Sequence, residues 1–185
     1  MKLVITVTVI VVATLTSLIG IRPISPALAD SYGYCYPPTG CRADNFEHTY
    51  CFGATMAGNG FQSAAGYGMT NLVNQTRFIK TFMANCSANT DVVFKRNDDM
   101  YPYIGRYNCL DWVGTTNKCN RARVEFNGSL LKNTLNKKKT ACHEIGHTGG
   151  LAHSGNANDC MINGLVSSGH VHYNAHHVAH LNHQN

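Results

Sequence analysis

Apolar side chains recur at helical spacing in one long stretch of the chain, residues 62–84. The apolar positions in this stretch recur three and four residues apart, and they include Leu72, Val73, Ile79 and Met83. This spacing places them on one side of a helix, so the pattern predicts a single long amphipathic helix over the stretch. We interpret this helix as core scaffold with no chemical role.

Shorter stretches have the composition or the alternation of β-strands: residues 46–52, 91–95, 101–110 and 121–127. In the last of these, Ala122, Val124 and Phe126 alternate with charged residues, which is typical of a half-buried strand. A turn rich in Gly, Thr and Asn joins the last two stretches and predicts a hairpin. Cys109 and Cys119 flank this turn, so we expect a disulfide across it. An edge strand of such a sheet could bind a peptide by strand addition.

A second helix is predicted from Lys137 to Thr148. Residues 133–136 supply capping residues before it, and Gly149 and Gly150 end it. Three lysines, residues 137–139, open this helix, where positive charge opposes the helix dipole. We interpret them as a solvated face; a contact with substrate or an anion is the alternative.

The C-terminal residues 170–183 hold six of the ten histidines. We interpret this segment as a final helix that packs on the domain and presents a polar, histidine-rich surface. His176, His180 and His183 fall on one helical face, so a second metal site is the alternative.

Residues 1–29 have the pattern of a secretory signal peptide. Lys2 precedes an apolar run from Leu3 to Gly20, and Ala27-Leu28-Ala29 offers a small-x-small cleavage site. An uncleaved membrane anchor is the alternative. We therefore expect a secreted protein with one domain, residues 30–185, and no stable membrane association after the signal is removed.

Charge and cysteine content narrow the class of protein further. Without Lys2 and Arg22 the chain has 13 lysines and arginines against 10 acidic residues, a net charge of +3 with histidine neutral. Because no basic stripe is interleaved with aromatic residues, we expect no nucleic-acid partner. Eight cysteines in an exported chain indicate four disulfides rather than free thiols, and the spacing leaves their connectivity open.

The candidate chemistry lies between His143 and His153. His143 and His147 are four apart, so a helix places both imidazoles on one side, with Glu144 beside them. Gly150 tolerates positive φ, and a chain reversal there can bring His153 to the same metal ion. Three protein ligands leave the fourth tetrahedral position for water, which is the arrangement of a catalytic site. The adjacent Cys142 lies about 100° round the helix from His143, which argues against Cys142 as a further metal ligand.

The pattern H-E-x-x-H-x-x-G-x-x-H, followed by Ser154 and by Met161, resembles the metzincin zinc endopeptidases. Within that family it is most similar to the matrixin branch and to small secreted actinobacterial relatives. The resemblance implies an α+β fold with a twisted mixed β-sheet, a long first helix, an active-site helix and a C-terminal helix.

The same resemblance assigns roles to the residues of the motif. It implies Zn²⁺ bound by His143, His147 and His153, and Met161 in a supporting turn beneath the metal. Because Cys160 precedes Met161, it also implies a disulfide between Cys142 and Cys160.

The activity that follows is hydrolysis of peptide bonds by a zinc-activated water, with Glu144 as general base. A protein or peptide substrate and a monomeric enzyme are expected. The alternative is a secreted histidine-rich protein that binds metal or a partner without turnover.

Overall fold

The computed structural model describes residues 42–156 and 158–183. The predicted signal peptide, residues 1–29, lies outside the described residues, as do Cys35 and Cys41. Within the described part of the chain, no helix is both long enough and apolar enough to cross a membrane.

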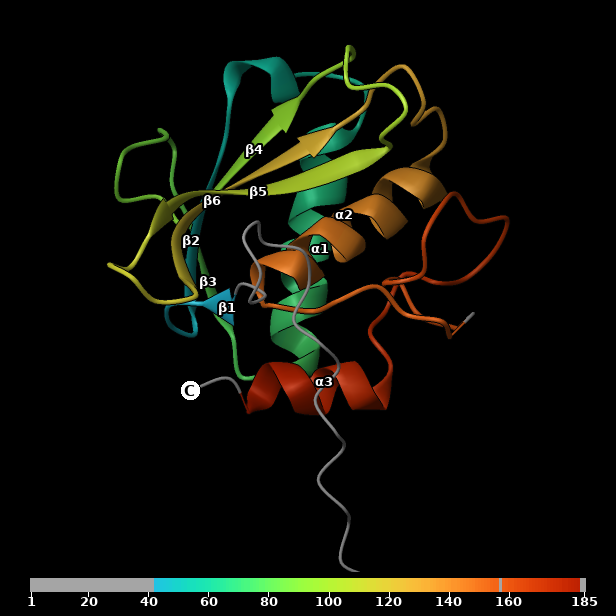
Figure 1. Ribbon diagram of the computed structural model, residues 1–185. Coiled ribbons are helices and arrows are strands. Elements are labelled where there is room, and N and C mark those ends of the chain that lie inside the picture. The colour runs from blue at the N-terminus through green and yellow to red at the C-terminus, as the bar shows by residue number, and fades with distance from the viewer. Residues whose placement is uncertain (1–41, 157, 184–185) are drawn as a thin grey trace, which may run out of the picture.

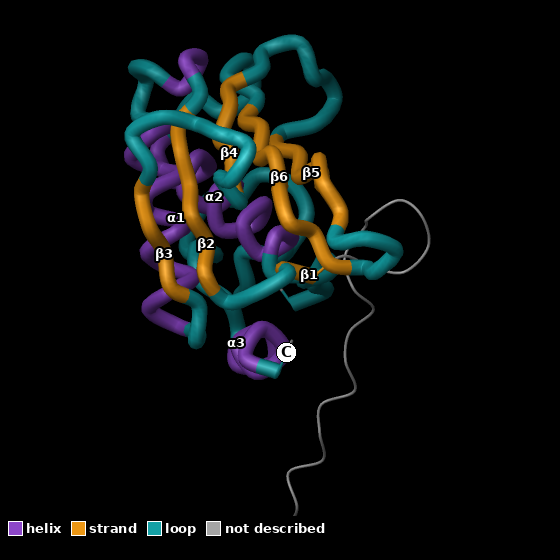
Figure 2. Tube along the Cα trace, turned by 90° about the vertical axis from the view of Figure 1, so that its left-hand side faces the viewer, coloured by secondary structure: helices purple, strands orange, loops and turns teal. Residues whose placement is uncertain are grey.

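A six-stranded, mostly parallel sheet forms one layer of the fold (Figure 2). Strands β3, β2, β4 and β6 lie side by side in this order and run parallel, whereas β5 pairs antiparallel with β6 and forms the edge. The short β1 runs parallel to the first residues of β6. The bounds are β1 Arg42–Ala43, β2 Glu47–Phe52, β3 Ile79–Phe82, β4 Val92–Arg96, β5 Gly105–Trp112 and β6 Lys118–Phe126, with a 3₁₀ turn at Ala54–Met56.

Helices α1 (Phe61–Gln75) and α2 (Thr134–Thr148) cover one face of the sheet, and α3 (Ala175–Asn182) lies at one end of the domain (Figures 1 and 2). The core between the sheet and the helices is apolar and includes Phe94, Phe126, Leu72 and Ile145, all fully buried. The fold is therefore α+β, as the sequence pattern predicts.

The prediction of one helix over residues 62–84 is wrong in its second half. Helix α1 ends at Gln75, and Thr76 is already extended, with φ −135° and ψ 180°. Phe78 is buried against the Phe46 ring, and the next four residues form β3 beside β2. The helical spacing of Ile79 was coincidental, because that side chain is 57% exposed on an edge strand.

The predicted hairpin is present, and three disulfides cross-link the described residues. One of them, Cys109–Cys119, joins β5 to β6 as expected. Cys142–Cys160 joins α2 to a later loop, and Cys51–Cys86 joins β2 to the segment after β3. The last pair was not anticipated, because it depends on the β3 strand that the pattern missed.

Helices α1 and α2 pack closely at Gly68. A Cβ added at Gly68 would lie 2.6 Å from Cδ1 of Ile145 and 3.0 Å from the carbonyl carbon of Ala141. Gly66, two residues earlier in α1, has no such neighbour within 4 Å. The position of α2, which carries the histidine motif, therefore depends on Gly68 having no side chain.

We expect Gly68→Ala to lower the free energy of unfolding by about 1–3 kcal/mol, because the methyl group would overpack the helix interface. The matched change Gly66→Ala should raise it by about 0.5–1 kcal/mol, since alanine favours the helix where there is room. Urea unfolding of both variants measures the difference. Equal effects of the two substitutions would contradict the proposed packing constraint.

Candidate metal centre

The C-terminal end of α2 has the hydrogen bonds of a Schellman motif. The N–H of Gly150 donates to the carbonyl of His147, and the N–H of Leu151 donates to that of Gly146, each at 3.0 Å. Gly150 has φ +89°, a conformation that glycine adopts without steric cost. This reversal turns the chain back toward α2 and brings His153 beside His143 and His147.

The three histidines form a group that could hold one metal ion. One candidate ligand atom from each ring lies within 4.8 Å of the other two, and the ring centroids are 4.7–5.0 Å apart. His143 is buried, whereas His153 is exposed, so the group is reached from solvent on the His153 side. The sequence-predicted ligand set is therefore brought together.

Main-chain carbonyls orient two of the imidazoles. Nδ1 of His143 lies 2.9 Å from the carbonyl oxygen of Cys160, and Nδ1 of His147 lies 2.7 Å from that of Leu151. A carbonyl oxygen can only accept, so each Nδ1 carries the proton and each Nε2 has its lone pair free for a metal. Burial lowers the pKa of His147 to about 4 and that of His143 well below its ordinary value. Both rings are thus neutral near pH 7, as metal ligation requires.

Met161 lies directly beneath the motif, fully buried. A Cβ added at Gly146 of α2 would be 2.4 Å from its sulfur, so the thioether packs against the helix backbone between the two ligand histidines. The adjacent Cys160 forms the disulfide with Cys142. The carbonyl that orients His143 is thereby tied covalently to the helix that carries His143.

Glu144 is buried between α2 and the edge strand β5. A Cβ added at Gly105 of β5 would lie 2.4 Å from its Oε1, and the backbone of Tyr107 hydrogen-bonds to the carboxyl group. Burial raises the pKa of Glu144 to about 8, although Lys139 and the Tyr107 hydrogen bond act in the opposite direction. Burial at this position therefore favours the protonated, neutral form of the carboxyl group.

The metal group and Glu144 open into a cleft of about 530 Å³. One wall is residues 102–107, which lead into and begin β5, and the other is α2. Asn163 and Gly164, just after Met161, close a third side. The cleft is thus built from three segments that are far apart in the sequence.

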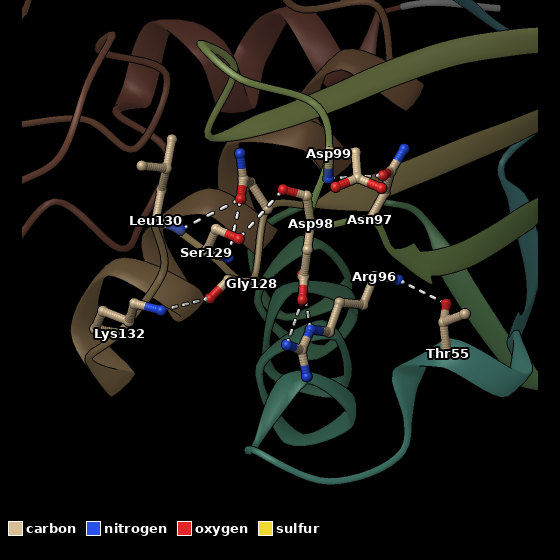
Figure 3. A network of polar contacts seen from close by, with 10 residues as sticks. Thr55, Arg96, Asn97, Asp98, Asp99, Gly128, Ser129, Leu130 and Lys132 are labelled. Carbon is tan, nitrogen blue, oxygen red and sulfur yellow. Dashed lines mark hydrogen bonds and ion pairs between the residues drawn. The ribbon is translucent and has the colours of Figure 1, made fainter.

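Polar contacts hold the loop that forms the β5 wall of this cleft. The buried Asn127 donates its side-chain amide to the carbonyl of Tyr103 and its backbone N–H to that of Ile104, both at 2.9 Å. Nearby, the Ser129 hydroxyl donates to the carbonyl of Asp98, whose carboxylate pairs with Arg96 (Figure 3). Nothing in the sequence pattern marked Asn127, because a single asparagine after a strand is a common loop residue.

The interpretation of the three lysines as a solvated face is wrong for Lys139. This side chain is only 3% exposed and lines the cleft. Its ammonium group donates hydrogen bonds to the carbonyl oxygens of Ile162 and Gly164. Lys137 and Lys138 lie near the rings of Phe61 and Tyr67 instead. A lysine at this position reaches inward because the loop after Met161 folds back over the first turns of α2.

The histidine-rich tail forms α3, but its histidines are not all on the surface. His177 is 1% exposed and its Nδ1 lies 2.5 Å from the buried carboxylate of Asp159. Among residues 42–156 and 158–183, only His143, His147 and His153 form a group of three or more side chains that could hold a metal ion. A second site at His176, His180 and His183 is therefore not assembled in the described chain.

Comparison with protein-family models and with curated proteins gives no match to this chain.

A buried histidine joins the end of α2 to the sheet. Nε2 of His48, on β2, lies 3.0 Å from the hydroxyl oxygen of Thr148, the residue after His147. Burial lowers the pKa of His48 to about 4. The folded protein thus holds this ring neutral where an unfolded chain, with the ordinary value of about 6.5, begins to bind a proton.

We expect His48 to contribute stability that is complete above about pH 6.5 and is lost as the pH falls toward 4, because the unfolded state then binds the extra proton. His48→Gln should therefore flatten the decline in the free energy of unfolding between pH 7 and 4.5, by up to roughly 3 kcal/mol. Urea unfolding in the presence of a chelator measures this. His183→Gln, on an exposed side chain, is the control; a wild-type slope in His48→Gln would contradict the assignment.

Proposed function

We propose that this protein is a secreted zinc-dependent endopeptidase of the metzincin type, in its matrixin-like branch. The observation that carries the proposal is the position of Glu144, a buried carboxyl group, beside three converging imidazoles at the bottom of an open cleft. A purely structural metal site would use a fourth protein ligand and would not need a proton acceptor next to it.

Zinc is the metal that fits this group best. Three neutral imidazoles with one open position are a common zinc set, whereas calcium and magnesium prefer oxygen ligands. When bound, zinc would lower the pKa of a coordinated water and polarise the scissile carbonyl. His143 and His147 hold their Nε2 atoms ready for it through the carbonyls of Cys160 and Leu151.

Glu144 would act as the general base. Its carboxylate takes a proton from the attacking water and returns that proton to the departing amine nitrogen. The hydrogen bond from the Tyr107 backbone keeps the carboxyl group in place. No serine or cysteine nucleophile is required.

The edge strand β5 supports a protein or peptide substrate. Its pairing with β6 uses one side of the strand, and its first residues line the cleft next to Glu144. An extended peptide could therefore add to β5 by main-chain hydrogen bonds and place a peptide bond at the metal. This also requires no partner chain, in keeping with a monomeric enzyme.

Secretion is supported by the cross-links. Disulfides persist in oxidising compartments, and three of them join described residues. The signal-peptide pattern at residues 1–29 is consistent with the same destination.

The alternative of a metal-binding protein without turnover has less support. It would use the histidine-rich tail for further metal ions, and within the described residues that tail supplies no second group. Metal content separates the two functions, since the protease requires one zinc per chain.

We expect Glu144→Gln to retain one zinc per chain but to lower kcat/KM for an unfolded protein or a quenched fluorescent peptide by about 10²–10⁴-fold, because the proton acceptor is lost. A chelator should abolish wild-type activity, and added zinc should restore it. Zinc content is measured by atomic emission on the same samples. The double variant His176→Gln/His183→Gln should match wild type in both zinc content and kcat/KM. Equal activity of wild type and Glu144→Gln, or inactivity of both with zinc bound, would reject the proposal.

Gly105→Ala should lower kcat/KM about tenfold or more without loss of zinc, because a methyl group at this point would collide with the Glu144 carboxylate and shift it. Gly66→Ala, at an uncrowded helix position, serves as the control. Unchanged kcat/KM in Gly105→Ala would show that Glu144 does not need its present position.

A further inference from the structure

The cleft contains a buried cation that the proposed reaction does not use. Lys139 lies on α2 four residues, about one turn, before His143, and lines the same cleft as the metal group. Its ammonium group contacts the carbonyl oxygens of Ile162 and Gly164, the latter at 3.0 Å. It therefore sits between the helix and the segment that closes the third side of the cleft.

No carboxylate of the described residues forms an ion pair with Lys139. The two acidic groups that act on it through space are already engaged. Asp159 pairs with His177 and accepts the N–H of Met161, and Glu144 faces Gly105 and the backbone of Tyr107. An ammonium group has three N–H donors, and among the described residues two neutral carbonyls accept from it.

Such a group is costly to bury without an opposite charge. Burial accordingly lowers the pKa of Lys139 to about 8, which still leaves the side chain mainly protonated at neutral pH. A ligand that brings a carboxylate to this part of the cleft would supply an opposite charge in direct contact and accept an N–H of the ammonium group.

The other cleft residues favour an anion at the same place. Glu144 is the single acidic residue among those that line the cleft, and its hydrogen bond is to the backbone of Tyr107. Arg106 is a second cation on the opposite wall of the cleft. Its guanidinium group is already paired, because Nη2 lies 2.8 Å from Oε2 of Glu125. Lys139 is thus the charge that a substrate side chain entering beside Asn163 and Gly164 would meet.

We propose that Lys139 selects a substrate carboxylate next to the scissile bond. The carboxylate would be an aspartate or glutamate side chain, or the C-terminal carboxylate of a short peptide. The position next to a cleaved bond rests on the proposed peptidase function. The preference for a carboxylate is a binding property of the cleft and does not depend on cleavage. If Lys139 only fastened residues 162–164 to α2, the charge of the ligand would have no effect.

The first test compares amidated quenched peptides that are identical except for Glu or Gln at either position flanking the cleaved bond. Wild type should prefer one of the Glu peptides by about tenfold or more in kcat/KM, the effect of a charge-assisted hydrogen bond. Lys139→Met should bring this ratio to within about twofold while still cleaving the Gln peptide, and Lys139→Arg should keep the preference. Lys138→Met, which lies beside Tyr67 instead, should behave as wild type.

A peptide with Gln at both positions and a free C-terminal carboxylate tests whether the site binds the C-terminus of a short peptide instead of an acidic side chain. Preference for this peptide over its amide, without preference for internal Glu, would assign the site to the C-terminus. Equal rates for all charged and neutral peptides in wild type would overturn the proposal while leaving the peptidase function intact.

The second test needs no turnover. Calorimetry on the zinc-loaded protein measures the Kd of a succinyl hydroxamate that carries a carboxyethyl side chain and of its carboxamide analogue. The acid should bind wild type about tenfold or more tightly than the amide, and the difference should vanish in Lys139→Met. If no peptide is cleaved but this ratio holds, the peptidase proposal fails and the carboxylate site stands. If Lys139→Met does not fold, the ratio of the two Kd values is compared between wild type and Lys139→Arg, which should both prefer the acid. Equal binding of the acid and the amide by wild type overturns the proposal.

Discussion

Two hydrogen bonds from imidazole Nδ1 atoms to main-chain carbonyls orient His143 and His147, two of the three histidines that could hold a metal ion. The acceptor for His147 is the carbonyl of Leu151, which belongs to the reversal at the end of α2. The acceptor for His143 is the carbonyl of Cys160, which a disulfide joins to Cys142. Each ring is therefore oriented by a segment whose own position is fixed, one by a helix cap and the other by a covalent bond. An imidazole without such a contact would rotate, and its neutral tautomer would not be defined.

The rest of the site depends on close approach of backbones to α2. Gly68 brings α1 against it, Gly105 brings β5 against Glu144, and Gly146 makes room for the sulfur of Met161. A larger side chain at any of these positions would displace a neighbour that belongs to the site or to its support. The same helix thus carries two of the three candidate ligands, the proposed base and the buried Lys139, and three glycines set how near its surroundings come.

Much of the local structure was predictable because it depends on neighbours in the sequence. The cap at Asn133, the end of α2 at Gly149 and Gly150, and the alternation in β6 each follow from residues within one or two turns or strand steps. The strand β3 was not predictable in this way. Its residues follow a helix without a strong stop signal, and they are extended because β2 offers hydrogen-bond partners and Phe78 finds a place in the core.

The sequence by itself determined the candidate ligand group, since the spacing of His143, Glu144 and His147 and the glycine at position 150 act within one helix and its cap. Only the tertiary structure decided what surrounds that group. The burial of Glu144 comes from β5 and the burial of Lys139 comes from the loop after Met161. The contacting residues Gly105 and Gly164 lie 39 and 25 positions away along the chain. Local spacing cannot encode such contacts, because they arise when the sheet and the core bring distant segments onto one helix.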